Sequence, residues 1–316
     1  MKDAIGGYFG LELRKGEHYH RNAIRLNTGR NCFEYILRAR AYTHVYIPYY
    51  TCEVMLEPLR KLHIPYSFYS INEQLEPTML PNLQTGEAFL YTNYYGLKQP
   101  CVERLALHYG KQLIVDNAQA FYAQHIAGID TFYTARKFFG IPDGAYLYTD
   151  GHLDIEMEQD NSVERMSHLL KRLESSAENG FADYQKNEEG LCNQPIKRMS
   201  RLTEHLLENI DYEAIAQTRK SNYKIIAHVL HPSNRLNLTI PDDAVPMVYP
   251  YWTSNGAELR RTLQQQRIYT ATYWPNVLQW NSLDLEQSMA LNLLPLPIDQ
   301  RYTKEELDNL LHHVIN

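Results

Sequence analysis

Short apolar segments alternate with amphipathic segments over the first half of the sequence, and few folds accommodate this alternation. β-Branched and aromatic residues dominate the apolar segments, as in strands, whereas the intervening segments place apolar residues at helical spacing. Strands joined by crossover helices pair in parallel, and helices cover both faces of such a sheet. We therefore predict an α/β fold with a mainly parallel central sheet flanked by helices. The expected strands are residues 44–48, 64–71, 87–92 and 111–116, and the expected helices include 53–62 and 101–110.

Polar residues stand where three of the expected strands end. Asn93 follows the strand at 87–92, Asp116 ends the strand at 111–116, and Thr134 ends the next short strand. In open parallel sheets, ligands bind beyond the carboxyl ends of the strands. We therefore expect these three residues to contribute to one binding site.

A lone lysine, Lys137, follows Thr134 in a turn that contains proline and glycine. Phe138 and Phe139 follow it and Arg136 precedes it, and both apolar surroundings and a neighbouring cation disfavour the ammonium form of a lysine. A lysine in such a setting can serve as a nucleophile. The alternative is an exposed lysine in a loop, which the local sequence on its own favours.

The carboxylate of Asp116 follows three apolar residues and emerges from a strand that we expect to be buried. A buried carboxylate requires a partner. One candidate is the protonated ring nitrogen of a ligand, and the other is a backbone N–H of Ala118 or Gln119. Both interpretations stay open at this point.

A glycine-containing turn at Thr28 and Gly29 precedes an expected helix. Backbone N–H groups at a helix N-terminus can receive a phosphate, although many such turns only begin helices. An amine, a carboxylate and a phosphate cradle are the three groups that pyridoxal phosphate requires from a protein. Lys137, Asp116 and the Gly29 turn could supply them.

The composition excludes several other classes of protein. A formal charge of −6 gives no electrostatic basis for binding nucleic acid or an anionic membrane. Four scattered cysteines without CxxC pairing favour neither a zinc site nor a disulfide framework, and we expect no metal. No apolar run has the length of a signal peptide or a membrane span, so we expect a cytoplasmic protein.

The character of the chain changes after residue 150. Residues 152–190 are charged and helix-forming, with breaks expected near Gly180 and Gly190, and a second helical region covers 198–230. Short strands and helices follow, and Thr303 with Glu306 has the pattern of a capping box. We predict two domains. The large one is 1–233, with 152–230 as its helical segment, and the small C-terminal α+β domain is 234–316.

Five segments together resemble the fold-type-I pyridoxal-phosphate enzymes, most closely the DegT/StrS-type sugar nucleotide aminotransferases. They are GRN at 29–31, PYYTC at 48–52, NYYG at 93–96, DNAQA at 116–120 and TARKFFGIPDGA at 134–145. The likeness extends to the VYPYW, YWP and LNLLPLPID segments of the C-terminal part. It implies a fold-type-I transferase, with 1–233 as the cofactor-binding domain, that moves an amino group from an amino acid to a keto-sugar, nucleotide-linked, in surface polysaccharide or secondary metabolite synthesis.

The resemblance assigns roles to individual residues. Lys137 would form the Schiff base with pyridoxal 5′-phosphate and shuttle the proton, and Asp116 would bind the ring nitrogen. Gln119 would donate to the phenolic oxygen. Thr134 and the backbone of Gly29, Arg30 and Asn31 would bind the phosphate, and Asn93 would contact the cofactor or the substrate. A lysine at 137 favours transamination, because in the sugar-dehydratase branch of the family the corresponding lysine looks replaced by histidine.

Some positions depart from the family pattern. Cys52 stands where an aromatic ring often lies against the cofactor, so that stacking would fall to Tyr94 or Tyr95. Ile196 and Lys197 replace the asparagine that a neighbouring subunit usually contributes before an Arg-Met pair. The family also implies a homodimer, with Arg30 and the N-terminal tyrosines as candidate substrate contacts.

These departures motivate an alternative, a protein that keeps the fold but acts as a binding or regulatory module. A third interpretation, an α/β nucleotide-binding enzyme without pyridoxal phosphate, is disfavoured because the sequence contains no GxGxxG or GxxxxGK[ST] motif.

Overall fold

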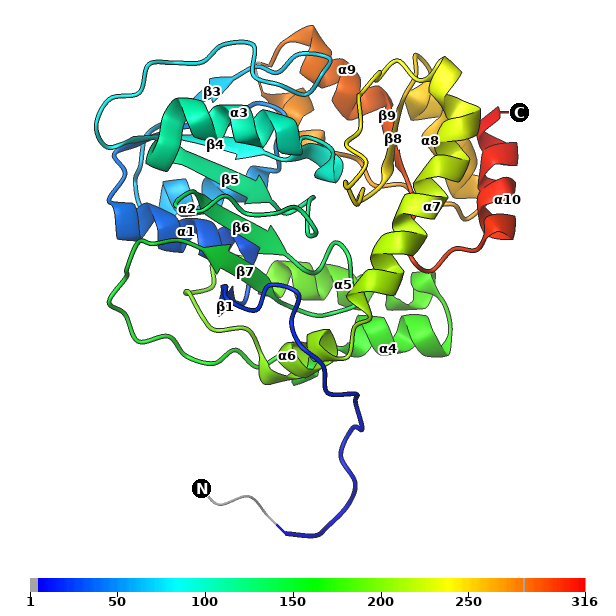
Figure 1. The fold of residues 1–316 in the computed structure, drawn as a ribbon. Coiled ribbons are helices and arrows are strands. Elements are labelled where there is room, and N and C mark those ends of the chain that lie inside the picture. Colours follow the sequence, from blue (N-terminus) through cyan, green and yellow to red (C-terminus); the bar gives the residue numbers. More distant parts are fainter. Residues whose placement is uncertain (1–4, 281, 316) are drawn as a thin grey trace.

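The computed structural model describes residues 5–280 and 282–315, and its centre is a seven-stranded sheet (Figure 1). The strand order is β1-β7-β6-β5-β4-β2-β3. Strands β2 to β6 pair in parallel, whereas β7 is antiparallel to both β6 and β1. The mainly parallel α/β sheet predicted from the sequence is confirmed. The strands are β1 (Ile24–Leu26), β2 (His44–Pro48), β3 (Tyr66–Tyr69), β4 (Glu87–Thr92), β5 (Leu113–Asn117), β6 (Asp130–Thr134) and β7 (Ala145–Tyr148).

Helices cover both faces of this sheet (Figure 1). On one face lie α1 (Gly29–Arg40) and α2 (Leu56–Lys61), and on the other lies α3 (Gln99–Tyr109). The alternation of side chains along a strand supplies the two apolar cores. In β5, Ile114 joins the core of α1 and α2, while Leu113 and Val115 join the core of α3.

Helix α1 begins where the sequence predicts. The hydroxyl of Thr28 accepts a hydrogen bond from the Asn31 N–H at 3.1 Å, which makes Thr28 the N-cap. The helix ends at Arg40, because Ala41 adopts a left-handed conformation with φ 52°. Short 3-10 helices lie at Glu53–Met55, Tyr94–Gly96, Gly110–Gln112, Val163–Arg165, His231–Ser233 and Pro275–Gln279.

The C-terminal part contains a small antiparallel sheet with its own apolar core. Its strands are β8 (Tyr249–Trp252) and β9 (Leu293–Leu296), which pair in register. Ile226 and Leu230 of α7 belong to the same core as these strands, so the helix before residue 233 packs with the C-terminal part. The domain boundary between 233 and 234 stays a prediction. The helices of this half are α6 (Arg201–Glu208), α7 (Tyr212–Leu230), α8 (Gly256–Gln265), α9 (Asp284–Asn292) and α10 (Lys304–Ile315).

Residues 152–190 differ from the expected helical pattern. Helix begins only at α4 (Ser167–Glu174), and α5 (Ala177–Gly190) follows it closely. The predicted break near Gly180 is wrong, since the helices separate at Ser175 and Ser176, and Gly180 lies inside α5. A Cβ at Gly180 would lie 2.7 Å from the His168 carbonyl oxygen, so this glycine permits a close contact between α4 and α5. The predicted break at Gly190 is confirmed, because α5 ends there.

Within residues 5–280 and 282–315, none of the helices has both the length and the apolar composition that spanning a membrane requires.

Candidate functional site

The predicted polar strand ends lie at one edge of the sheet. Asn93 follows β4, Asp116 is the fourth residue of β5, and Thr134 is the last residue of β6. These strands are adjacent and parallel, so their carboxyl ends point the same way. The structure therefore confirms that the three residues gather at one end of the central strands.

The N-terminus of α1 reaches the same edge. A Cβ at Gly29 would lie 3.7 Å from the Phe132 ring and 4.0 Å from the Thr134 Cβ. Asp116 is two positions after Ile114, which faces α1, so both side chains lie on the same face of the sheet. The first N–H groups of a helix have no acceptor within the helix. Thr134 and the start of α1 therefore present donors next to each other.

Not all of the predicted phosphate donors are available. The Asn31 N–H is bonded to Thr28, and the Asn31 side chain donates to the Pro195 carbonyl at 2.7 Å. The Arg30 guanidinium pairs with Glu57 at 2.8 Å, which commits it to α2 rather than to a substrate. Only the N–H groups of Gly29 and Arg30 and the Thr134 hydroxyl remain of the predicted set, and that hydroxyl makes only a long contact, 3.4 Å, to the Gly144 carbonyl.

A tight turn after β6 presents Lys137. The Ala135 carbonyl accepts from the N–H groups of both Phe138 and Phe139 at 3.0 Å. The two phenylalanine side chains are buried, whereas Lys137 between β6 and this pair is exposed. The two apolar anchors thus hold the turn and leave the lysine free to reach outward.

Residues far along the chain fix the back of this turn. Gln300 donates to the Phe138 carbonyl at 2.8 Å, and Arg219 of α7 donates to it at 3.4 Å. Arg219 is 2% exposed and stacks over the Phe138 ring, with 4.7 Å between the guanidinium carbon and the ring centroid. Burial lowers the pKa of Arg219 to about 10. The C-terminal part of the chain therefore helps to position Lys137.

Asp116 and Lys137 interact electrostatically, as their convergence predicts. Burial raises the pKa of Asp116 above its usual value, while the positive charge of Lys137 opposes that shift. The Asp116 Oδ1 atom accepts from the Ala118 N–H at 2.8 Å, so the backbone interpretation also holds. A buried carboxylate with a raised pKa gains from a further cationic partner.

Gln119 carries the most informative unpaired atom of the site. It is fully buried, and its Oε1 accepts from the Tyr95 N–H at 3.0 Å. Its Nε2 has no partner among the described residues. Buried amide donors are normally bonded, so this one indicates an acceptor that the chain does not supply.

Asn93 is committed to the chain. Its Oδ1 accepts from the Lys98 N–H at 2.9 Å, and its Nδ2 donates to Gln99 at 3.2 Å. The residue is fully buried and organises the turn into α3. These contacts explain Asn93 without a ligand.

The ring beside Lys137 belongs to Tyr273, a residue that the sequence did not single out. The Lys137 Nζ lies 5.8 Å from the Tyr273 ring centroid. Burial raises the pKa of Tyr273, and the nearby, half-buried Cys52 acts in the same direction. The two side chains therefore lie close to each other. Tyr94 and Tyr95 are fully buried, and Tyr95 lies behind Tyr273, with 6.2 Å between ring centroids. The YWP segment at residues 273–275 was the available signal, since it belongs to the resemblance.

A cavity of about 560 Å³ adjoins Lys137. Its walls carry further cations from three parts of the chain, namely Arg136, Arg172, Arg219 and Arg301. Arg136 pairs with Glu188 of α5. Asp299 is the carboxylate that lines this cavity, so the surroundings of Lys137 are predominantly positive. Asp116 and Gln119 lie outside the lining of this cavity.

Comparisons of sequence identify no relative: no protein-family model matches this chain, and no curated protein does.

Comparisons of structure identify several proteins of similar fold. DesV of S. venezuelae, solved with a ketimine intermediate, has a TM-score of 0.64 and 18% identity over 92% of this chain and 83% of that one. NtdA from Bacillus subtilis, solved with bound cofactor PMP, has a TM-score of 0.64 and 15% identity over 92% and 72%. The GDP-4-keto-6-deoxymannose-3-dehydratase ColD, a mutant solved with bound GDP-perosamine, has a TM-score of 0.62 and 12% identity over 92% and 88%. The chain therefore has the fold of these proteins, the fold-type-I architecture that the sequence predicts.

Proposed function

We propose that this chain is a divergent, short member of the DegT/StrS-type aminotransferases and that it depends on pyridoxal 5′-phosphate. It would transfer an amino group from an amino acid to a keto-sugar, nucleotide-linked, in surface polysaccharide or secondary metabolite synthesis. The observation that carries the proposal is the placement of Lys137, buried Asp116 and the unpaired Nε2 of Gln119 at one edge of a fold shared with DesV and NtdA.

The residues at this edge fit the cofactor. Lys137 would bind its aldehyde carbon, and Asp116 would keep the ring nitrogen protonated, a charge that the buried carboxylate favours. Gln119 Nε2 would donate to the phenolic oxygen. Thr134 and the N–H groups of Gly29 and Arg30 would hold the phosphate, as helix N-termini commonly do. When bound, the cofactor supplies an electron sink for the substrate carbon.

The amino group of Lys137 would also move a proton at the substrate carbon. Phe138 and Phe139 anchor its turn, and Arg219 and Gln300 hold the carbonyl behind it. A fixed base within reach of the reacting carbon is the requirement for this step. Tyr273 would lie against the reacting groups and exclude water from one side.

The choice of acceptor and of reaction rests on separate arguments. ColD, which has the same fold, is a dehydratase solved with GDP-perosamine. That neighbour supports a nucleotide-linked sugar as acceptor, but its fold alone does not separate dehydration from transamination. A lysine at position 137 favours transamination.

We further propose that the protein acts as a homodimer in the cytoplasm. Ile5, Tyr8, Phe9 and Leu11 are all more than 70% exposed and lie on an N-terminal arm that leaves the body (Figure 1). Apolar side chains at this density are typical of an interface with another chain. A second copy would cover them.

The proposal is tested by adding pyridoxal phosphate to the purified protein and recording its visible absorbance. We expect a bound-cofactor band that is absent in Lys137→Ala and retained in Lys186→Ala, an exposed lysine of α5. Glutamate should then convert the band. Equal spectra for wild type and Lys137→Ala would refute the proposal, and a band that no amino donor converts would indicate a binding or regulatory module instead.

A further inference from the structure

Arg219 of α7 begins a series of hydrogen bonds that reaches Gln119. The Arg219 Nη1 donates to the Met247 carbonyl at 2.9 Å. The Met247 N–H donates to the Tyr95 carbonyl, also at 2.9 Å, and the Tyr95 N–H donates to Gln119 Oε1 at 3.0 Å. This last bond holds one side of the Gln119 amide and leaves its unpaired Nε2 on the other side. Arg219 is therefore connected to the orientation of Gln119 through two backbone segments.

The other end of the Arg219 guanidinium holds the turn of Lys137. Its Nη2 donates to the Phe138 carbonyl at 3.4 Å, and its guanidinium carbon lies 4.7 Å from the centroid of the Phe138 ring. A guanidinium at this distance from a ring face is attracted to it, so Arg219 contacts both the backbone and the side chain of Phe138. Gln300 adds a shorter bond, 2.8 Å, to the same carbonyl. Because Phe138 follows Lys137, one guanidinium joins the segments of Lys137 and Gln119.

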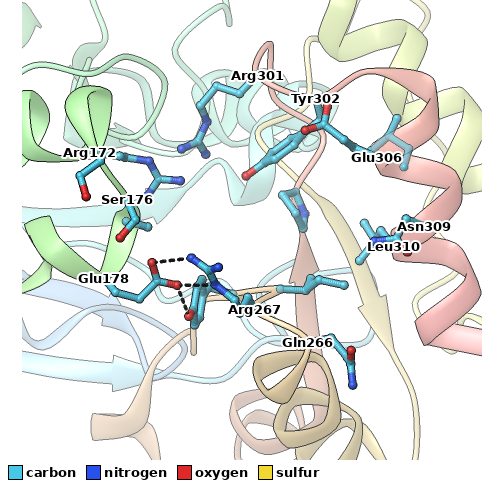
Figure 2. Close-up of a pocket in the computed structure, with 16 residues that line it drawn as sticks. Arg172, Ser176, Glu178, Gln266, Arg267, Arg301, Tyr302, Glu306, Asn309 and Leu310 are labelled. Carbon is cyan, nitrogen blue, oxygen red and sulfur yellow. Dashed lines mark hydrogen bonds and ion pairs between the residues drawn. The ribbon is translucent and has the colours of Figure 1, made fainter.

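The hydrogen bonds of Arg219 go to backbone carbonyls and not to a carboxylate. Asp299 lies within electrostatic reach of Arg219, but its two oxygens accept from Arg301 at 2.7 and 2.8 Å. Arg301 in turn lines a neighbouring pocket (Figure 2). Burying a charged group is costly unless it is hydrogen-bonded. The bonds that compensate the burial of Arg219 are therefore the ones that connect the two segments.

The backbone of Tyr95, the middle of this series, is in an unusual conformation. Its φ is 57°, which is unfavourable for a bulky residue. Such conformations persist where the surrounding structure determines them, commonly at functional sites. A Cβ at the next residue, Gly96, would lie 3.0 Å from the Val245 carbonyl oxygen and 3.3 Å from that of Gln119. The segments around residues 95, 119 and 245 are therefore closely packed.

We propose that Arg219 is a positioning residue that fixes Gln119 and Lys137 relative to each other. This inference rests on the proposed function for what these two residues bind. The phenolic oxygen and the aldehyde of pyridoxal phosphate stand on adjacent ring carbons, so Gln119 and Lys137 must keep a constant spacing to bind both. A displacement of about 1 Å can lower a rate about 100-fold. Arg219 acts through these neighbours and not on the reacting atoms.

The first test measures hydrogen exchange in the cofactor-free chain. Arg219→Met introduces an apolar side chain without donors, so the segments 93–97 and 245–248 should open more readily. We expect their protected backbone N–H groups to exchange about tenfold faster than in wild type, as for the loss of one hydrogen bond.

Arg260→Met is the matched control. Arg260 of α8 is half-buried, and it also donates to two backbone carbonyls, those of Leu291 and Leu293, at 2.9 and 2.8 Å. Its Nε, like that of Arg219, has no partner among the described residues. Arg260→Met therefore removes a similar group from a place that is not bonded to either segment. It should match wild type in both the exchange and the cofactor measurements.

The second test uses the chain loaded with pyridoxal phosphate. In Arg219→Met we expect a changed visible circular dichroism of the bound cofactor, because this signal depends on how the ring is held. The half-reaction with glutamate should slow about tenfold or more, while the glutamate concentration for half the maximal rate stays unchanged. Arg219→Lys keeps the positive charge but not the planar fork of donors, so it should show the same changes. It takes the place of Arg219→Met if that variant does not fold.

The positioning role is overturned if Arg219→Met leaves exchange in both segments as in wild type, or if Arg260→Met slows the half-reaction equally. A wild-type rate in Arg219→Lys would also overturn it, because the charge alone would then be sufficient. Absence of a cofactor band in wild type refutes the proposed function instead. Hydrogen exchange in the cofactor-free chain then decides independently whether Arg219 connects the two segments.

Discussion

Asp116 accepts a hydrogen bond from the backbone of Ala118, and in the proposed function it would also bind the ring nitrogen of the cofactor. The two roles respond differently to removal of its charge. An asparagine retains an Oδ1 acceptor for the Ala118 N–H but cannot stabilise a protonated ring nitrogen. The substitution Asp116→Asn therefore separates the structural role from the catalytic one.

In Asp116→Asn, we expect the cofactor-free protein to melt at the wild-type temperature or a few degrees higher, because burial disfavours the native carboxylate. The rate of the half-reaction with an amino donor should fall about 100-fold or more, a size typical of losing one electrostatic contact to a reacting group. Scanning calorimetry and single-turnover absorbance measure the two effects. A rate close to wild type would contradict the assignment of Asp116.

The buried histidines give the protein a pH dependence that is independent of catalysis. His20 is 4% exposed, and its Nε2 donates to the Phe121 carbonyl at 2.8 Å. Burial lowers the pKa of His20 from 6.5 to about 3. Between these values the unfolded chain binds a proton that the folded chain does not. Stability is therefore lost as pH falls below about 6.5.

The substitution His20→Gln removes this proton uptake and keeps an N–H donor for Phe121. Between pH 7 and pH 5, wild type should lose about 2 kcal/mol more unfolding free energy than His20→Gln. Urea unfolding at the two pH values measures the difference. Equal losses in both proteins would show that His20 titrates normally in the folded state.

Individual residues also mark the limit of what the sequence could predict about the site. The strand-end positions of Asp116 and Thr134 follow from short runs of apolar, β-branched and aromatic residues that end on a polar residue, a signal that local sequence carries. Tyr273 lies beside Lys137 although it is 136 positions away, and only tertiary packing brings the two together. Arg30 was expected at the substrate but pairs with Glu57, because the helix after Gly29 directs its side chain toward α2.

At the scale of elements, strands were easier to predict than the helices of the middle segment. The strand at 87–92 matches β4 because its apolar residues are buried on both faces. The expected break at Gly180 failed because glycine there serves the contact between α4 and α5, not a turn. A glycine inside a helix carries no local mark of which neighbour approaches it.

The substitution Gly180→Ala tests that contact. Its Cβ would lie 2.7 Å from the His168 carbonyl oxygen, so one helix must shift. We expect a loss of about 1–3 kcal/mol in unfolding free energy, the usual range for an overpacked contact. Gly190→Ala is the matched control, because nothing lies within 4 Å of a Cβ at that end of α5. Chemical denaturation that finds both variants equally stable would refute the close packing of α4 and α5.

At the scale of the whole molecule, the N-terminal arm is the segment that a second copy would cover in the proposed dimer. Tyr8 is 99% exposed and Phe9 is 91% exposed, while the arm is attached to the body by the Arg14 N–H, which donates to Asn209 at 2.9 Å. Replacing Tyr8 and Phe9 together by serine should weaken association without unfolding the body. Sedimentation should show a wild-type dimer at micromolar concentration and a shift toward monomer in the variant. A monomeric wild type would contradict the proposed assembly.

The proposed function depends on one covalent link, that between Lys137 and the cofactor. Reducing the pyridoxal-phosphate-loaded protein with borohydride and mapping the modified peptide by mass spectrometry tests it most directly. We predict a single pyridoxyl group on Lys137, and none on that peptide in Lys137→Ala. A protein that remains unmodified, or that carries the group on another lysine while Lys137 is free, would contradict the assignment.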